Sequence, residues 1–72
     1  YENAIKYYKQ SIVRNNYDAA YNLAVVYFNL KEIQKHNTVV LDELGKDYLK
    51  KYYHLFNDET KKKADIFIDK KF

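Results

Sequence analysis

The side chains able to carry acid–base or metal chemistry are few and poorly spaced for it. His36 and His54 are the only histidines, cysteine is absent, and neither an H-E-x-x-H motif nor a histidine pair at helical spacing occurs. Asp42–Glu43 and Asp58–Glu59 are carboxylate pairs, but adjacent residues do not face each other on a helix. Ser11, the only serine, falls on a predicted packing stripe. We therefore expect no catalytic residue, no metal and no cofactor.

Lysines and tyrosines offer a second kind of chemistry, the binding of anions. The lysines at 61–63, with Lys50 and Lys51, loosely resemble a two-part nuclear import signal, and tyrosines alternate with lysines over 46–53. Such a segment could stack on bases or lie on an anionic membrane. The net charge is only +3 and both signs are mixed along the chain, whereas a nucleic-acid binder concentrates its positive charge. A solvated helix face is the better interpretation of the lysines, and core packing is the better interpretation of Tyr48 and Tyr52, which fall on an apolar stripe.

Length and composition predict one helical domain. The chain has 72 residues, near the lower limit for a self-sufficient hydrophobic core. With no proline, one glycine and no cysteine, it lacks both the turn residues of a β-sandwich or barrel and any disulfide. No stretch approaches the roughly 20 apolar residues of a membrane span, and no signal peptide is visible. The compartment is left open, with an intracellular location favoured.

Two helices are expected in the first half of the chain, because apolar side chains recur there at helical spacing. One covers residues 2–14 and the next about residues 17–30 or slightly beyond. Between them, Asn15 suits the left-handed conformation that closes a helix. Asn16 can then serve as the N-cap of the second helix. The two asparagines therefore predict a helix stop followed by a helix start.

Small residues on these stripes predict a close contact between helices. Ser11, Ala20 and Ala24 have little bulk beyond Cβ, so they let another backbone come near the short end of the usual interaxial range. Tyr8 and Tyr27 are long enough to fill the flanks of such a contact. The stretch is therefore expected to hold two antiparallel helices tightly together.

A third helix is expected over about residues 38–56, after a connector at 34–38. Asn37 or Thr38 can cap its start. Its apolar positions are Val40, Leu41, Leu44, Tyr48, Leu49, Tyr52, Leu55 and Phe56. Gly45 lies inside this helix, where glycine costs about 1 kcal/mol relative to alanine. It marks either a close helix crossing or a bend.

A fourth helix is expected to begin at Asn57 or Asp58. Acidic residues early in this segment and lysines late suit the helix dipole. Its apolar face consists of Ala64, Phe67, Ile68 and Phe72. The alternation in DIFID is a weaker signal for a strand.

The stretch from residue 7 to residue 27 resembles the Sel-one-like repeat, a short relative of the tetratricopeptide repeat. That repeat reads as a WY-x-K-A-A helix end, a Gly-Asn-x-x-A turn and an A-x-Y-N-L-G-x-x-Y helix. The matching residues are Tyr7, Tyr8, Gln10, Ser11 and Ile12, then Asn15, Asn16, Asp18 and Ala19, and finally Tyr21, Asn22, Leu23, Ala24 and Tyr27. No gap is needed, whereas a tetratricopeptide repeat would need about two more residues in the turn.

The resemblance covers about residues 1–30 and departs from the family at several positions; Asn15 and Ala24, for example, replace glycines. It implies an all-α fold of about four helices, arranged as antiparallel pairs of an α-solenoid. Residues 1–33 would be a repeat-like pair, and residues 37–72 divergent or capping helices, since end repeats are commonly atypical. Because the sequence starts inside a helical pattern, we expect a single helical-repeat domain over 1–72 that is the C-terminal fragment of a longer solenoid.

The resemblance also implies a binding face, because such repeats present ligands with the first helix of each pair. Here that face is Asp18, Tyr21, Asn22, Val25, Phe28 and Asn29. Aromatic and amide side chains suit an adaptable protein contact surface. The competing interpretation is that Tyr21 and Phe28 pack on a preceding helix or on the third helix. A clamp for carboxylate-ended peptides is disfavoured, since Val25 stands where such clamps have asparagine and the face has no basic residue.

These observations predict a non-enzymatic protein–protein interaction scaffold built from helical repeats, whose partner is another protein or a peptide. One alternative is nucleic-acid or anionic-surface binding through the Lys- and Tyr-rich C-terminal helices. Another is a regulatory domain of a larger enzyme. The identity of the partner and the oligomeric state are left open.

Overall fold

The computed structural model describes residues 2–34 and 36–71, and within these ranges it is all-helical, with no strand. The elements are α1 (Glu2–Val13), α2 (Asp18–Ile33), α3 (Thr38–Tyr52), the short 3₁₀ helix η1 (Tyr53–Leu55) and α4 (Asp58–Lys71). The prediction of an all-α chain with four helices is confirmed. The DIFID segment, for which a strand was the weaker alternative, is helical.

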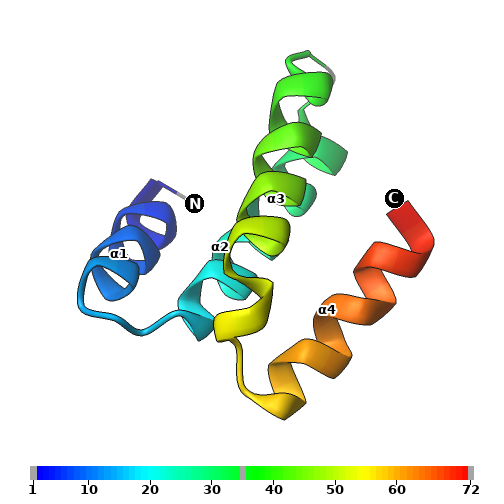
Figure 1. Ribbon diagram of the computed structural model, residues 1–72. Helices are drawn as coiled ribbons and strands as arrows, with labels where there is room; N and C mark the ends of the chain where they lie inside the picture. The colour runs from blue at the N-terminus through cyan, green and yellow to red at the C-terminus, as the bar shows by residue number, and fades with distance from the viewer. Residues whose placement is uncertain (1, 35, 72) are drawn as a thin grey trace.

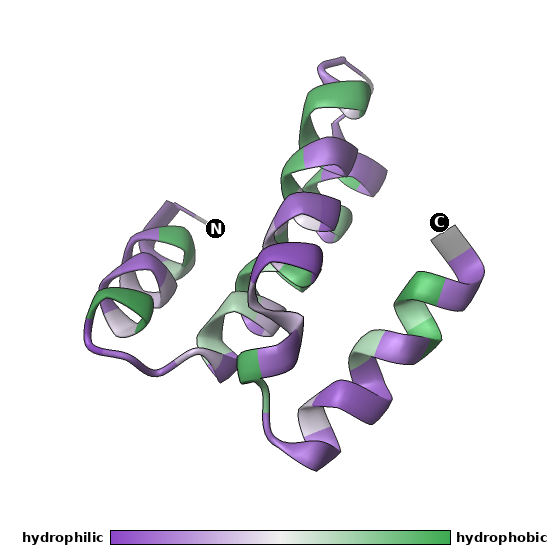
Figure 2. Ribbon diagram, in the orientation of Figure 1, coloured by the Kyte–Doolittle hydropathy of each residue, from purple (hydrophilic) through white to green (hydrophobic). Residues whose placement is uncertain are grey.

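The helices α2 and α3 form an antiparallel pair at the centre, with α1 and α4 on opposite sides of it (Figure 1). Helix α2 supplies most of the buried side chains, whereas α1 has no buried residue. Helix α4 is hydrophilic in its first half and has its hydrophobic residues in the second (Figure 2). The central pair therefore carries the core, and the outer helices lean against it.

The end of α1 confirms the role predicted for Asn15. This residue has φ 69°, in the left-handed region that asparagine tolerates better than most side chains. The backbone N–H of Asn15 donates to Ile12 O at 2.9 Å, and that of Asn16 donates to Ser11 O at 2.9 Å. Together these bonds form a Schellman closure, which satisfies carbonyls that the helix end would leave unpaired.

The cap predicted for α2 is wrong, and the cap predicted for α3 is right in position but makes no side-chain bond. Tyr17, not Asn16, directly precedes α2, and its side chain makes no capping bond. Asn37 directly precedes α3, but it adopts the left-handed conformation with φ 60° and also makes no side-chain cap. An N-cap side chain usually needs an extended backbone to reach the first free N–H groups. Asn57 does act as a cap, because its Oδ1 accepts the N–H of Thr60 at 2.8 Å.

The core is built around the small residues of α2, as expected. Ala20 and Ala24 have no exposed surface, which confirms that they lie where helices pack closely. Ser11 is only half-buried, and its hydroxyl donates to Tyr7 O at 3.1 Å within α1. The buried cluster that joins α2, α3 and α4 contains Ala20, Ala24, Phe28, Leu49, Phe56 and Ala64.

Two residues placed on the apolar stripe of the third helix are not part of the core. Val40 is 55% exposed and Leu55 is 50% exposed. Val40 lies in the first turn of α3, at the tip of the hairpin. Leu55 belongs to η1, whose tighter winding changes the direction of its side chains relative to an α-helix. Phe72, expected on the apolar face of the last helix, lies outside the described residues.

Gly45 marks a close crossing of α3 over α2, which decides between the two roles predicted for it. A Cβ atom at this position would lie 2.6 Å from Cε1 of Phe28. Such a distance is far below a normal van der Waals contact. The absence of a side chain therefore lets the Phe28 ring lie directly against the α3 backbone.

Candidate functional site

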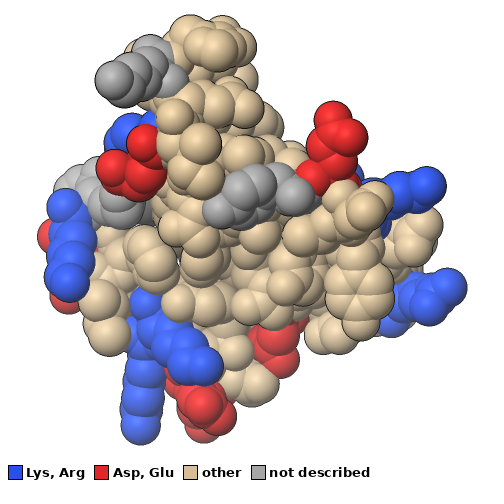
Figure 3. All heavy atoms as spheres, turned by 180° about the vertical axis from the view of Figure 1, so that it is seen from behind, with Lys and Arg blue, Asp and Glu red and all other residues tan. Residues whose placement is uncertain are grey.

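The predicted binding residues share one face of α2, but the structure places them in different surroundings. From behind, where α2 lies in front of α3, the centre of the molecule carries few charged side chains and the charges gather at its rim (Figure 3). The sequence accounts for this, because residues 19–30 contain no charged residue. The candidate site is thus an uncharged strip of α2 between the two outer helices.

Asn22, Val25 and Asn29 form the accessible part of this strip, which we call the amide face. The two asparagines are exposed and Val25 is half-buried. Seven residues correspond to two helical turns, so the amides project from the same side, about 10 Å apart along the axis. Each amide offers two donors and an acceptor. The face can therefore form several hydrogen bonds around one apolar contact.

Phe28, predicted on the same face, is a core residue with 3% of its surface exposed. Its ring is stacked on that of Phe67 from α4, with centroids 5.4 Å apart and planes at 15°. On the α3 side the ring meets Gly45. Packing on the third helix was the competing interpretation of this residue. The structure adds α4 as a second contact.

Tyr21 also contacts α4. Its ring meets the ring of Phe67 edge to face, with centroids 5.9 Å apart. Burial raises the pKa of the Tyr21 phenol above its ordinary value. The aromatic residues of the predicted face, Tyr21 and Phe28, thus pack against α4. The asparagines of that face, Asn22 and Asn29, are exposed to solvent.

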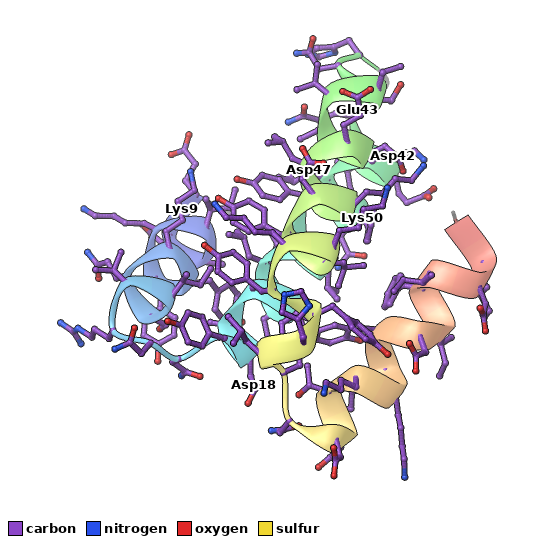
Figure 4. All side chains as sticks on the ribbon, in the orientation of Figure 1. Lys9, Asp18, Asp42, Glu43, Asp47 and Lys50 are labelled. Carbon is purple, nitrogen blue, oxygen red and sulfur yellow. The ribbon has the colours of Figure 1, made fainter. Side chains whose placement is uncertain are left out.

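Asp18 ties α2 to the start of α4. Its Oδ1 accepts the backbone N–H of Asn57 at 3.1 Å, and its Oδ2 accepts the side-chain amide of Asn57 at 2.8 Å. Figure 4 shows Asp18 at the base of the molecule, near the point where the chain turns into α4. Both oxygens of the Asp18 carboxylate therefore already accept hydrogen bonds within the chain.

The sequence did not predict a row of four stacked tyrosines, of which two belong to α3, one to α2 and one directly precedes α2. Tyr27 stacks on Tyr48 with centroids 5.9 Å apart, Tyr48 on Tyr52 at 6.2 Å, and Tyr52 on Tyr17 at 5.7 Å. The spacing of Tyr48 and Tyr52 signals a shared helix face. Their pairing with Tyr17 and Tyr27 depends on how α2 and α3 align, which local spacing does not determine.

An open hollow of about 620 Å³ adjoins this tyrosine row on α3. It is lined by Leu44, Asp47, Tyr48, Lys50, Lys51 and Tyr52. The ammonium of Lys51 lies 5.5 Å from the centroid of the Tyr52 ring, a cation–π geometry. Tyr48 stacks on two tyrosines of the chain, Tyr27 and Tyr52.

Near the hairpin tip, the carboxylate of Asp42 on α3 binds one lysine of α2 and one lysine of its own helix. Asp42 accepts from Lys31 of α2 at 3.0 Å and from Lys46 of its own helix at 2.9 Å. The hydrogen bond from Lys46, together with the bond and charge of Lys31, holds the pKa of the Asp42 carboxyl below its ordinary value. Figure 4 shows Asp42 on the upper part of α3. We call Lys31, Asp42 and Lys46 the ionic clamp; they supply some of the charges that surround the uncharged strip.

The described residues contain no group of three or more His, Cys, Asp or Glu side chains that could hold a metal ion. In the same part of the chain, no helix has both the length and the hydrophobicity required to cross a lipid bilayer. The side chains on offer are amides, tyrosine edges and lysines, which suit recognition. Comparison with known proteins gives no match to this chain among protein-family models, curated proteins or solved structures.

Proposed function

We propose that this chain is a non-enzymatic protein-interaction module of the helical-repeat kind, which holds a peptide or protein segment along the amide face of α2. The observation that carries the proposal is the uncharged outer strip of the central helix, with Asn22 and Asn29 exposed on either side of Val25. Helix α2 is packed against α3 and α1. A face on such a helix is held in place before a partner arrives, which lowers the entropic cost of binding.

The spacing of the amides suits an extended peptide. Two helical turns correspond to about 10 Å, close to the length of three residues of an extended chain. The two amides could each bond a backbone group of the peptide, while Val25 contacts a side chain between them. Backbone recognition of this type tolerates many sequences, as expected of a scaffold.

Apolar side chains left in solvent on the outer helices support the repeat-like part of the proposal. On α1, Tyr7 is 65% and Val13 is 82% exposed, and on α4 Ile66 is 55% exposed. A helix pair in a solenoid buries its apolar surface only when further helices stack on it. Neighbouring helix pairs on one or both sides would cover these residues.

The test is a selection of peptides from a random phage-displayed library, followed by titration of a selected peptide into ¹⁵N-labelled chain. We expect amide shifts that centre on Asn22, Val25 and Asn29. The double variant Asn22→Ala/Asn29→Ala should bind at least about tenfold more weakly, at about 1 kcal/mol or slightly less per lost hydrogen bond. Asn3→Ala, an exposed asparagine on α1, is the matched control and should bind normally. Selected peptides that bind the double variant as well as the parent would refute the proposal.

The Lys- and Tyr-lined hollow on α3 favours a second candidate, the binding of nucleic acid or another anionic surface. Lys50 and Lys51 line it together with Tyr48 and Tyr52. Tyr48 and Tyr52 already stack on other tyrosines of the chain, however, whereas base stacking needs a free aromatic face. A fluorescent oligothymidine titrated at increasing salt tests this candidate. Binding that falls steeply with salt supports it, whereas absent or salt-independent binding excludes it.

A further inference from the structure

The surface beneath α4 has a specific shape. Phe28 lies between the α3 backbone at Gly45 and the stacked ring of Phe67, and Tyr21 adds an edge contact to the same ring. One turn before Phe67, Ala64 is fully buried and packs in the cluster that contains Phe56. We call the surface formed by Tyr21, Phe28, Gly45 and Phe56 the notch. It is occupied by an alanine and, three residues later, a phenylalanine.

Helix α4 is attached to the notch by a narrow contact. Among its described side chains, Ala64 is the only buried one, and Thr60, Lys61, Phe67 and Ile68 are half-buried. The Tyr53 hydroxyl of η1 donates a hydrogen bond to Asp65 Oδ1 of α4 at 2.6 Å, and this bond is exposed to solvent. Water competes for exposed hydrogen bonds, so they contribute little to holding a helix in place. The apolar part of the attachment depends mainly on Ala64, which is buried in the core cluster, and on Phe67, which stacks on Phe28.

The connection between η1 and α4 is extended, and the residues before α4 are fixed to the rest of the chain. Phe56 is buried and has an extended backbone, with φ −73° and ψ 152°. Asn57 is anchored to Asp18 by two hydrogen bonds. These contacts fix the chain to α2 and the core as far as Asn57, and α4 begins at the next residue. A rotation there would uncover the notch while Phe56 stays in place.

Building on the proposed function, we propose that α4 is an internal occupant of a helix-binding site. The partner of the notch is an amphipathic helix that carries alanine three residues before phenylalanine and displaces α4. The alanine lets the helix axis approach α2 closely, and the phenylalanine stacks on Phe28. Since Gly45 removes the side chain that would push Phe28 outward, the notch is formed before any partner binds. A tethered competitor acts at millimolar effective concentration, so α4 sets how strongly an outside helix must bind.

The test uses a synthetic peptide of residues 57–71 with blocked ends, titrated into full-length ¹⁵N-labelled chains. The chain variant Phe67→Ala should bind this peptide at least about tenfold more tightly than the parent chain, because its own α4 no longer fills the notch. The amide of Gly45 should shift on binding. The same peptide carrying Phe67→Ala should not bind. Ile66→Ala, made in the chain and in the peptide, is the matched control, since this neighbouring side chain is exposed, and it should change neither result.

A folded Phe67→Ala chain that binds the peptide no better than the parent would overturn the inference. If that chain loses helicity throughout, the variant Asp65→Ala replaces it, because it loosens α4 without touching the notch. It should bind the peptide about two- to threefold more tightly, since one exposed hydrogen bond is lost, and unchanged binding would overturn the inference equally. Phage-selected peptides still bound at Asn22 and Asn29 would show that the proposed function stands even when this inference fails.

Discussion

The central pair α2–α3 and the outer helices α1 and α4 are built on different principles. The pair has buried side chains on both of its helices, a glycine crossing and an ionic clamp at its tip. Helix α1 buries no residue, and Ala64 is the one buried side chain among those described in α4. We expect this difference to make the central pair the more stable part of the molecule and the outer helices the less stable part. In this account the amide face belongs to the central pair and the notch lies where the central pair and an outer helix meet.

The largest effect is expected from Leu49→Ala. Leu49 is fully buried in α3, and truncating such a leucine costs about 2–5 kcal/mol through lost burial and the cavity left behind. Urea unfolding measures the free energy of unfolding. Val13→Ala on α1, where the side chain is 82% exposed, is the contrasting variant and should change stability by less than about 0.5 kcal/mol. Equal losses of unfolding free energy in the two variants would contradict the distinction between the central pair and the outer helices.

Gly45→Ala is expected to come next. Alanine is the better helix former by about 1 kcal/mol, yet its Cβ would lie 2.6 Å from Phe28 Cε1. Overpacking of a filled core costs about 1–3 kcal/mol, and Phe28 is held by Phe67 on its other side. We therefore expect a net loss of stability in thermal or urea unfolding. Gly45→Ala should cost less in a chain that already carries Phe67→Ala, because the Phe28 ring can then move away. A net gain from Gly45→Ala alone would show that the crossing is loose.

Asp42→Asn should have a smaller and pH-dependent effect. The lysines lower the pKa of Asp42 in the folded chain below its value of 3.8 in the unfolded chain. The stabilisation is therefore present above pH 3.8 and is lost as pH falls through the folded pKa. With 18% of the side chain exposed, we expect about 0.5–1 kcal/mol at pH 7. Urea unfolding of both chains at pH 7 and pH 2 should show the difference shrink; a constant difference would mean that charge is not the cause.

Asp65→Ala is expected to give the smallest effect, a change in the pKa of Tyr53. The hydrogen bond to Asp65 raises the pKa of Tyr53 above 10.0. Without the carboxylate, the Tyr53 pKa should return toward that value, as followed by NMR of ¹³C-labelled tyrosine. Asp69→Ala, another exposed carboxylate of α4, should leave Tyr53 unchanged. A Tyr53 pKa that is the same in the parent chain and in Asp65→Ala would show that this hydrogen bond does not join α4 to η1.

Local signals in the sequence were sufficient for the helices but not for how they meet. Asn15 predicted the end of α1, and Ala20 and Ala24 predicted the tight contact, because both depend on backbone geometry within a few residues. Asn16 was wrong as the cap of α2 and Asn37 makes no side-chain cap, since cap geometry depends on the backbone angles of the turn as well as on residue type. The contacts of Phe28 with Phe67 and of Tyr48 with Tyr27 join distant segments, so spacing along the chain could not reveal them. The binding roles of Asn22, Val25 and Asn29 remain predictions.

Native-state hydrogen exchange tests the central division most directly. It reports the free energy of opening at each backbone amide. We predict that amides in the middle of α2 and α3, including Leu23 and Leu49, exchange only through global unfolding, while those of α4 exchange at least about tenfold faster through local opening. Phe67→Ala should speed exchange in α4 and leave Leu23 unchanged. If all four helices exchange at one common opening free energy, the outer helices are integral to a single cooperative core and the account is contradicted.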